Sequence, residues 1–266
     1  PAGQRLQRAL SEKLSPVPAF DLVSVAAIFL ALALGGTVKG ATGAGAPVIA
    51  VPVIAAFLDE RLGVMIMAAP NLMSNSWQIW QYRAHLLPGK FTWVFAGGAA
   101  LGCIAGTFLL AILPERVLVL TVALAVTTYI CLRLLKPEFQ LTDAGAQRIV
   151  VPAGLASGVL QGAAGISAPV SISYLNAMRL ARPTFIATIS ACFIAMAVVQ
   201  VPTLMATGLL TPPLLALSVL ALIPILLFMP LGAWLARALS AQAFDKLVLW
   251  LLSVMALRLF YVAIWG

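Results

Sequence analysis

Charged residues are scarce in this chain of 266 residues: they make up 9% of it, whereas hydrophobic residues make up 62%. A soluble domain carries about 25% charged and about 45–50% apolar residues. Because so little charge cannot cover the surface of a water-soluble particle, the composition excludes a cytosolic enzyme, a disordered tail and a nucleic-acid-binding module. The sequence therefore predicts an all-α, polytopic integral membrane protein.

Groups for acid–base catalysis and metal binding are also scarce. The chain has one histidine, His85, and its cysteines lack the spacing of a metal site. The acidic residues lie at the ends of apolar segments or between them, so none is expected at mid-membrane. We therefore expect no enzyme, no cofactor, and no carboxylate-based proton relay or sodium site. The cysteines are Cys103, Cys131 and Cys192, and the acids are Glu12, Asp21, Asp59, Glu60, Glu115, Glu138, Asp143 and Asp245.

Basic residues outnumber acidic residues by 16 to 8, which gives a net charge of +8. They lie mostly between apolar stretches, where Lys and Arg anchor a protein at the membrane surface, so nucleic acid is not an expected partner. In the polar segment 1–19, Leu6, Leu10 and Leu14 recur every four residues. This spacing predicts an N-terminal amphipathic helix on the surface of the lipid bilayer.

The apolar stretch 20–58 is about twice as long as the roughly 20 residues that cross a bilayer. Its middle, from Gly35 to Pro47, holds five glycines, a lysine and a proline, which interrupt a helix. We therefore expect a glycine-broken helical hairpin over 20–58. Three plain transmembrane helices are expected after it, at 62–82, 91–113 and 115–136, and complete a first repeat over 20–136.

The polar stretch 137–148 is expected to link two homologous halves. The pattern then recurs over 149–266, with a second broken hairpin at 149–178 and helices at 183–207, 213–239 and 243–265. A constant shift of 122 residues (36 to 158) matches the two breaks, which indicates an internal duplication. The shift carries Gly36, Gly40, Ala41, Gly43, Ala46, Pro47 and Val48 onto Gly158, Gly162, Ala163, Gly165, Ala168, Pro169 and Val170, and Lys39 onto Gln161.

The relative orientation of the halves depends on how each broken stretch meets the membrane. If it enters and leaves on one side, each half adds three crossings and the repeats are inverted, as in many transporters. If it crosses once, each half has four spans and the repeats are parallel. The short arms around a midplane break suit a hairpin, so we prefer the inverted repeat.

The two breaks are the expected transport site. Irregular backbone at membrane depth must line a cavity or be buried in protein, because lipid cannot satisfy its polar groups. New half-helices are expected to start near Gly45 and Ser167, each followed by a proline, and their N-termini would favour an anion. Lys39 lies beside the first break in a long apolar stretch, where a charge suggests function. The alternatives are a packing kink for the glycines and snorkelling for Lys39.

A polar stripe runs along the expected helix 62–82, with a weaker counterpart around Gln200 in helix 183–207. The stripe consists of Asn71, Ser74, Asn75 and Gln78. These residues fall at i, i+3, i+4 and i+7, so they share one helical face, which predicts the wall of a ligand cavity. Interhelical hydrogen bonding is the alternative. The residues expected to bind substrate are Lys39, Gly40, Thr42, Gly43, Gly45, Asn71, Ser74, Asn75, Gln78, Gln161, Gly162, Gly165, Ser167 and Gln200.

The expected function is transport of a small anion. Export needs no coupling ion, because each negative charge that leaves a negative cell interior gains about 2.3 kcal/mol per 100 mV. A passive anion channel with the same pore is a second hypothesis, and a membrane scaffold or enzyme is a third. Homo-oligomerisation stays open.

The first break, Gly40-Ala41-Thr42-Gly43-Ala44-Gly45-Ala46-Pro47-Val48, resembles the glycine-rich motif of the sulfite exporter TauE/SafE family, and so does its copy at Gly162–Val170. Both copies have fewer consecutive glycines than the family pattern. The resemblance extends over nearly the whole chain from about residue 21. It implies a multi-pass permease of the plasma membrane, in bacteria the cytoplasmic (inner) membrane, that exports sulfite, sulfoacetate or a related organosulfonate.

Overall fold

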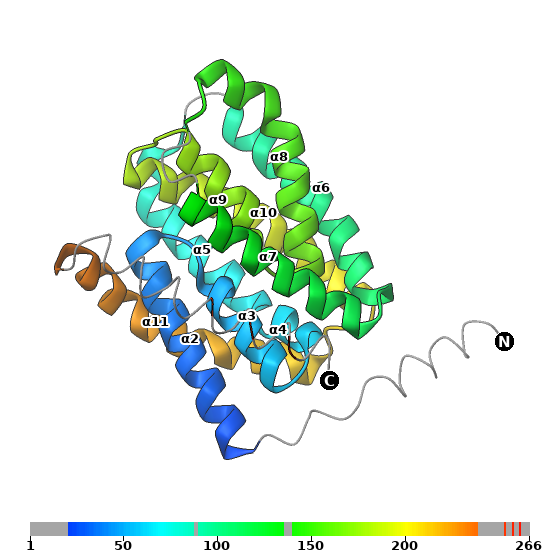
Figure 1. Cartoon of the computed structure of the whole chain (residues 1–266). Helices are drawn as coiled ribbons and strands as arrows, with labels where there is room; N and C mark the ends of the chain where they lie inside the picture. Colours follow the sequence, from blue (N-terminus) through cyan, green and yellow to red (C-terminus); the bar gives the residue numbers. More distant parts are fainter. Residues whose placement is uncertain are drawn as a thin grey trace.

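The computed structural model describes residues 21–87, 90–135 and 140–238, together with positions 253, 257 and 261. These residues form helices joined by short connections (Figure 1). The expected amphipathic segment 1–19 and nearly all of the expected last helix 243–265 lie outside the described residues. The helices are α2 (Leu22–Thr42), α3 (Ala46–Phe57), α4 (Glu60–Ile66), α5 (Ala68–Tyr82), the 3-10 turn η1 (Arg83–His85), α6 (Phe91–Ile112), α7 (Glu115–Leu135), α8 (Asp143–Ala164), α9 (Ala168–Ala177), α10 (Arg182–Ala206) and α11 (Pro212–Ala238).

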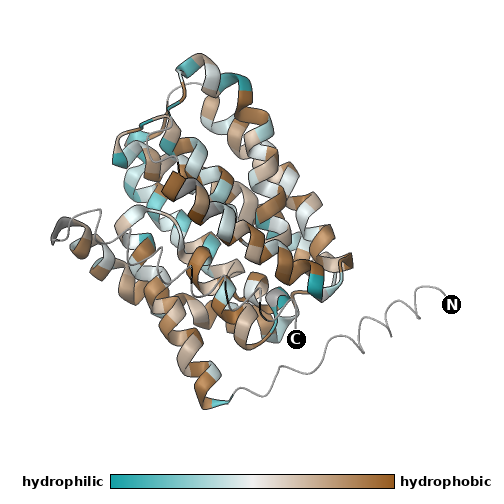
Figure 2. Ribbon diagram, viewed as in Figure 1, coloured by the Kyte–Doolittle hydropathy of each residue, from teal (hydrophilic) through white to brown (hydrophobic). Residues whose placement is uncertain are grey.

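Four of the helices in the described part of the chain, α2, α6, α10 and α11, are long and apolar enough to cross a membrane. Each of these helices has large hydrophobic side chains that are exposed. Figure 2 colours many of the residues in the helices brown, for hydrophobic. Large hydrophobic residues exposed in this way have no favourable contact with water, whereas lipid accommodates them. The prediction of an all-α, polytopic membrane protein is confirmed.

The first broken stretch folds as a helical hairpin. Helix α2 ends at Thr42, and Gly43 and Gly45 adopt positive φ angles of 84° and 101°, which favour glycine because it has no Cβ. Helix α3 then begins at Ala46 and runs back beside α2. A Cβ added to Gly35 would lie 3.0 Å from the carbonyl oxygen of Ala46, so the two backbones meet closely.

The second broken stretch has the same construction. Helix α8 ends at Ala164, Gly165 has a φ of 66°, and α9 begins at Ala168. Ser167 occupies the N-cap position of α9, but its side chain makes no capping hydrogen bond. Its hydroxyl oxygen instead accepts a hydrogen bond from the Ser171 hydroxyl at 3.3 Å.

Packing along the glycine-rich helices joins the two halves. Helix α2 packs on α11, and α8 packs on α6. A Cβ on Gly40 would lie 1.9 Å from the carbonyl oxygen of Met229, and one on Gly158 would lie 2.0 Å from that of Ala99. Small residues thus allow the backbones to approach directly, as is common between membrane helices. Helices from both halves pack in a row in the order α8, α6, α10, α5, α11, α2.

The segment expected as one helix over 62–82 is divided between α4 and α5. Pro70 has no N–H to donate to the carbonyl of Ile66, four residues earlier. The Ser218 hydroxyl of α11 donates to this carbonyl at 2.9 Å and accepts from the N–H of Ala69 at 2.8 Å. A side chain from the other half therefore completes the backbone hydrogen bonding at this division.

The segment expected as a linker over 137–148 is shorter in the structure. Helix α8 already begins at Asp143, and the Thr142 side chain caps it by accepting from the N–H of Gly145. Threonine followed by an acidic first turn is a common start of a helix.

Replacing Gly102 with alanine is expected to lower the thermal unfolding midpoint of the detergent-solubilised protein. The new Cβ would lie 2.2 Å from the Leu155 carbonyl oxygen, so α6 and α8 would have to separate. Gly97 on the same helix has nothing within 4 Å of its Cβ position and provides the matched control. Gly97→Ala should leave the midpoint unchanged or raise it, since alanine favours helix by about 1 kcal/mol over glycine. Equal effects of both variants would contradict the proposed packing.

Replacing Ser218 with alanine is expected to destabilise the protein by about 1–3 kcal/mol, because a buried N–H and a buried carbonyl would lose their partner. The control is Ser76→Ala, since the Ser76 hydroxyl bonds only within its own helix, to the Leu72 carbonyl at 2.7 Å. Thermal unfolding in one detergent measures both. An unchanged midpoint in Ser218→Ala would show that the hydroxyl does not support the division of the helix.

Candidate transport site

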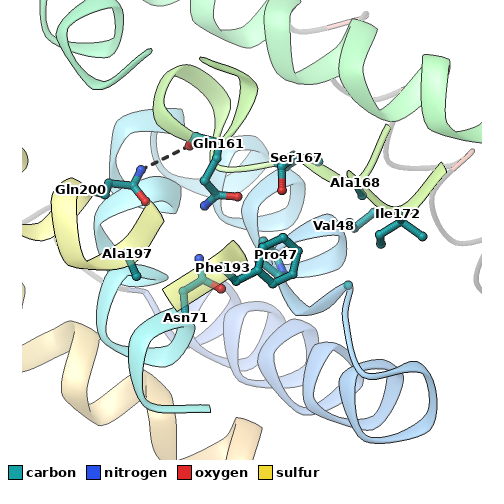
Figure 3. Close-up of a pocket in the computed structure, with 12 residues that line it drawn as sticks. Pro47, Val48, Asn71, Gln161, Ser167, Ala168, Ile172, Phe193, Ala197 and Gln200 are labelled. Atoms are coloured by element: carbon teal, nitrogen blue, oxygen red, sulfur yellow. Dashed lines mark hydrogen bonds between the residues drawn. The ribbon is translucent and has the colours of Figure 1, made fainter. Parts of the chain in front are cut away.

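A small cavity lies where the two broken helices meet (Figure 3). Its volume is about 10 Å³, which is about the room for one water molecule. Elements of both halves form its wall: the starts of α3 and α9, the end of α8, and one face each of α5 and α10. The lining residues are Gly45, Pro47, Val48, Asn71, Gln161, Ile166, Ser167, Ala168, Ile172, Phe193, Ala197 and Gln200.

The N-terminal ends of α3 and α9 both open on this cavity. Gly45 and Ser167 hold the N-cap positions, and a proline follows in the first turn of each helix. The N–H of Val48 and that of Val170 turn back to the carbonyls of these N-cap residues, at 3.1 Å each. The first residues of a helix carry amides without an intrahelical acceptor and a partial positive charge. Two such ends at one cavity make its electrostatic potential more favourable for an anion.

Neutral polar side chains face the space between the helix ends. Figure 3 shows the amide groups of Asn71 and Gln161 and the hydroxyl of Ser167 turned toward it. Gln200 donates from Nε2 to the backbone carbonyl of Gln161 at 3.2 Å. Amide and hydroxyl groups of this kind can donate hydrogen bonds to an oxyanion.

Lys39 lies behind the cavity wall, inside the protein. The residue is 1% exposed, so its ammonium does not reach the surface, and snorkelling is excluded. Its Nζ donates to Oδ1 of Asn75 at 2.7 Å and lies 5.9 Å from the ring centroid of Phe193. Within the described part of the chain, no carboxylate forms an ion pair with Lys39. Its positive charge is therefore partly balanced by an amide oxygen and an aromatic face.

The two halves repeat one hydrogen-bonding arrangement. The carbonyl of Lys39 accepts from the N–H of Gly43 at 2.7 Å and from Nε2 of Gln78 at 3.5 Å. The carbonyl of Gln161 accepts from the N–H of Gly165 at 2.9 Å and from Nε2 of Gln200 at 3.2 Å. The sequence shift of 122 residues relates each partner to its counterpart.

The structure brings five of the residues expected to bind substrate to the cavity: Gly45, Asn71, Gln161, Ser167 and Gln200. The polar stripe of α5 divides. Asn75 accepts a hydrogen bond from the Lys39 ammonium, and Gln78 accepts one from the Ser190 hydroxyl at 3.4 Å. The Ser74 hydroxyl donates to the Pro70 carbonyl of its own helix.

The remaining glycines and Thr42 serve the backbone around the breaks. Gly40 and Gly162 contact the backbones of α11 and α6, while Gly43 packs on Ile186 and Gly165 on Val51 and Val64. The Thr42 hydroxyl lies within hydrogen-bond distance of the carbonyls of Val38 and Ala44 in the turn and has one proton to donate to them. These positions shape the breaks without lining the cavity.

The apolar wall of the cavity was not predicted from the sequence. Phe193, Ala197 and Ile172 line it, and Pro47 and Val48 complete it. Apolar side chains in an apolar membrane helix carry no distinguishing pattern. Only the position of Phe193, 122 residues after the predicted site residue Asn71, could have drawn attention to it.

Two helix breaks that meet at one cavity, with polar side chains in its wall, are characteristic of a membrane transporter. The chain matches the family described as "Sulfite exporter TauE/SafE" over residues 28–259, and it belongs to this family. The protein is thus a membrane transporter of the class that exports sulfite- and organosulfonate-type anions, and not an enzyme. No curated protein and no solved structure matches the chain.

Replacing Asn75 with leucine is expected to destabilise the protein by about 1.5–3 kcal/mol, because the buried ammonium of Lys39 loses its acceptor. The double variant Lys39→Met/Asn75→Leu should recover most of this loss, since no charge remains buried without a partner. Unfolding midpoints of the two single variants and the double variant give the coupling energy. Additive effects would mean that the bond between the two side chains contributes nothing.

Proposed function

We propose that this protein exports a small sulfur-containing or organic anion, such as sulfite, sulfoacetate or a related organosulfonate, through the cavity between the starts of α3 and α9. Gly45, Asn71, Gln161, Ser167 and Gln200 contact the anion in this proposal. The observation that carries it is the meeting of two half-helix N-termini at one cavity that polar side chains also line.

Electrostatics supports an anionic substrate. The cavity is lined by neutral donors and two positive helix ends, and a buried ammonium stands behind the ring of Phe193. The eight acidic residues of the chain all lie outside the breaks. An anion in the cavity would therefore meet attraction from several directions, whereas a cation would meet a charge of its own sign.

The order in which the helices pack supports a two-fold relation between the halves, and the opposite directions of α2 and α8 support an inverted one. The shift of 122 residues exchanges α2 with α8, α5 with α10 and α6 with α11, so the order α8, α6, α10, α5, α11, α2 reads the same from both ends. In Figure 1, α2 rises from the lower edge of the view and α8 descends from the upper edge. We propose that the halves are inverted around the cavity, near the middle of the bilayer.

The cavity has to widen for transport. Room for about one water molecule is too little for sulfite or any sulfonate. We propose that α3 and α9 move relative to α5 and α10 when the anion enters, and that access alternates between the two sides. In the bacterial cytoplasmic membrane, a negative interior would drive an exported anion outward by about 2.3 kcal/mol per charge and 100 mV.

Sulfite or sulfoacetate is expected to raise the unfolding midpoint of the purified protein, with about 2.7 kcal/mol of stabilisation at a hundred times the dissociation constant. Lys39→Met should weaken this effect, because the anion loses a nearby positive charge. Lys90→Met is the matched control, since Lys90 is an exposed residue before α6. A panel with sulfate, thiosulfate, taurine, acetate and chloride measures selectivity.

Two results would contradict this proposal. Stabilisation by taurine alone, with none by the anions, would exclude a purely anionic substrate. Equal losses in Lys39→Met and Lys90→Met would show that the charge of Lys39 does not attract the anion.

A passive channel differs from a transporter in its flux. Proteoliposomes loaded with unlabelled sulfite should accumulate labelled sulfite against its gradient, because an alternating site exchanges one anion for another. Saturable counterflow supports the transporter. Flux that only follows the gradient and does not saturate would favour the channel.

A further inference from the structure

Phe193 contacts both the cavity and the buried ammonium of Lys39. The side chain is 7% exposed and lines the cavity. The same ring lies under Nζ of Lys39, with 5.9 Å between Nζ and the ring centroid. One aromatic side chain thus borders both the cavity and the ammonium of Lys39.

Phe193 is the bulkiest side chain on the face of α10 that lines the cavity. Phe193, Ala197 and Gln200 fall at i, i+4 and i+7, so they share one side of the helix. Ala197 has only a methyl side chain, and the amide of Gln200 donates to the carbonyl of Gln161. The ring of Phe193 is therefore the part of this face that most limits the size of the cavity.

The repeat shows that this ring is a feature of one half. The shift of 122 residues relates Phe193 to Asn71, a polar residue that also lines the cavity. The same shift relates Lys39 to Gln161. The amides of Asn71 in the first half and Gln161 in the second line the cavity, whereas their counterparts, Phe193 and Lys39, form the contact between an aromatic ring and an ammonium.

From these contacts we infer that Phe193 is the specificity-determining residue of the site: its ring limits the size of the substituent on the anion and separates the anion from Lys39. This inference rests on the proposed function and adds to it the residue that selects among anions. If the ring is removed, the volume that it occupies is added to the cavity on the side of the Lys39 ammonium. A sulfonate with a bulky apolar substituent then fits, with its headgroup at the helix ends.

The test compares two anions with the same headgroup, methanesulfonate and benzenesulfonate, on the full chain in detergent. Titration calorimetry gives the ratio of their affinities. Phe193→Ala is expected to shift this ratio toward benzenesulfonate by about tenfold or more, the scale of size discrimination in an apolar pocket. Phe193→Leu removes less volume and should give a smaller shift in the same direction, and it serves if the alanine variant does not fold.

Phe185→Ala is the matched control. Phe185 lies two turns earlier on α10, is 8% exposed, and packs in a hydrophobic cluster without lining the cavity. Its truncation should lower the stability of the protein but leave the ratio of the two sulfonate affinities unchanged. The same ratio in Phe193→Leu, Phe185→Ala and the unaltered protein would overturn the inference and leave the proposed function intact. Failure of the unaltered protein to bind sulfite, sulfoacetate or either sulfonate would overturn the proposed function itself.

Discussion

Every backbone N–H and C=O group within a bilayer needs a partner inside the protein, because hydrocarbon offers none. The two helix breaks leave such groups open, and the fold is arranged around them. At the end of α2, the carbonyl of Lys39 is shared by Gly43 and Gln78, and that of Ala41 accepts from Arg182 of the other half at 2.7 Å. Carbonyl groups in the last turns of α2 and α8 thus accept hydrogen bonds from neighbouring residues, while the N-termini of α3 and α9 remain turned toward the cavity.

The same constraint explains why the two halves depend on each other. Helix α2 finds its close glycine contact on α11, and α8 finds its contact on α6. The division between α4 and α5 is completed by Ser218 of the second half. Each half therefore supplies what the other lacks, and the cavity is formed only when both are in place. Lys39 adds a charge whose desolvation is tolerated because Asn75 and Phe193 surround it.

Local chemistry made the breaks predictable from the sequence. Glycines that adopt positive φ, followed by a proline in the first turn, define the ends at Gly43 and Gly165, and the shift of 122 residues relates them. Contacts distant in sequence were not predictable. Ser218 bonds to residues 149 and 152 positions earlier, and no local pattern indicates this. The sequence predicts that the polar stripe of α5 forms one wall of the cavity. In the structure its residues contact the cavity, Lys39 or their own helix, because tertiary packing decides which side chain meets which neighbour.

A direct test of the central claim is to locate a bound anion. Selenite is a close analogue of sulfite, and its selenium gives an anomalous X-ray signal. The account predicts a selenium peak between the starts of α3 and α9, within hydrogen-bond reach of the residues around Gly45 and Ser167. A peak at another site, at a concentration where binding in solution is saturated, would contradict the account.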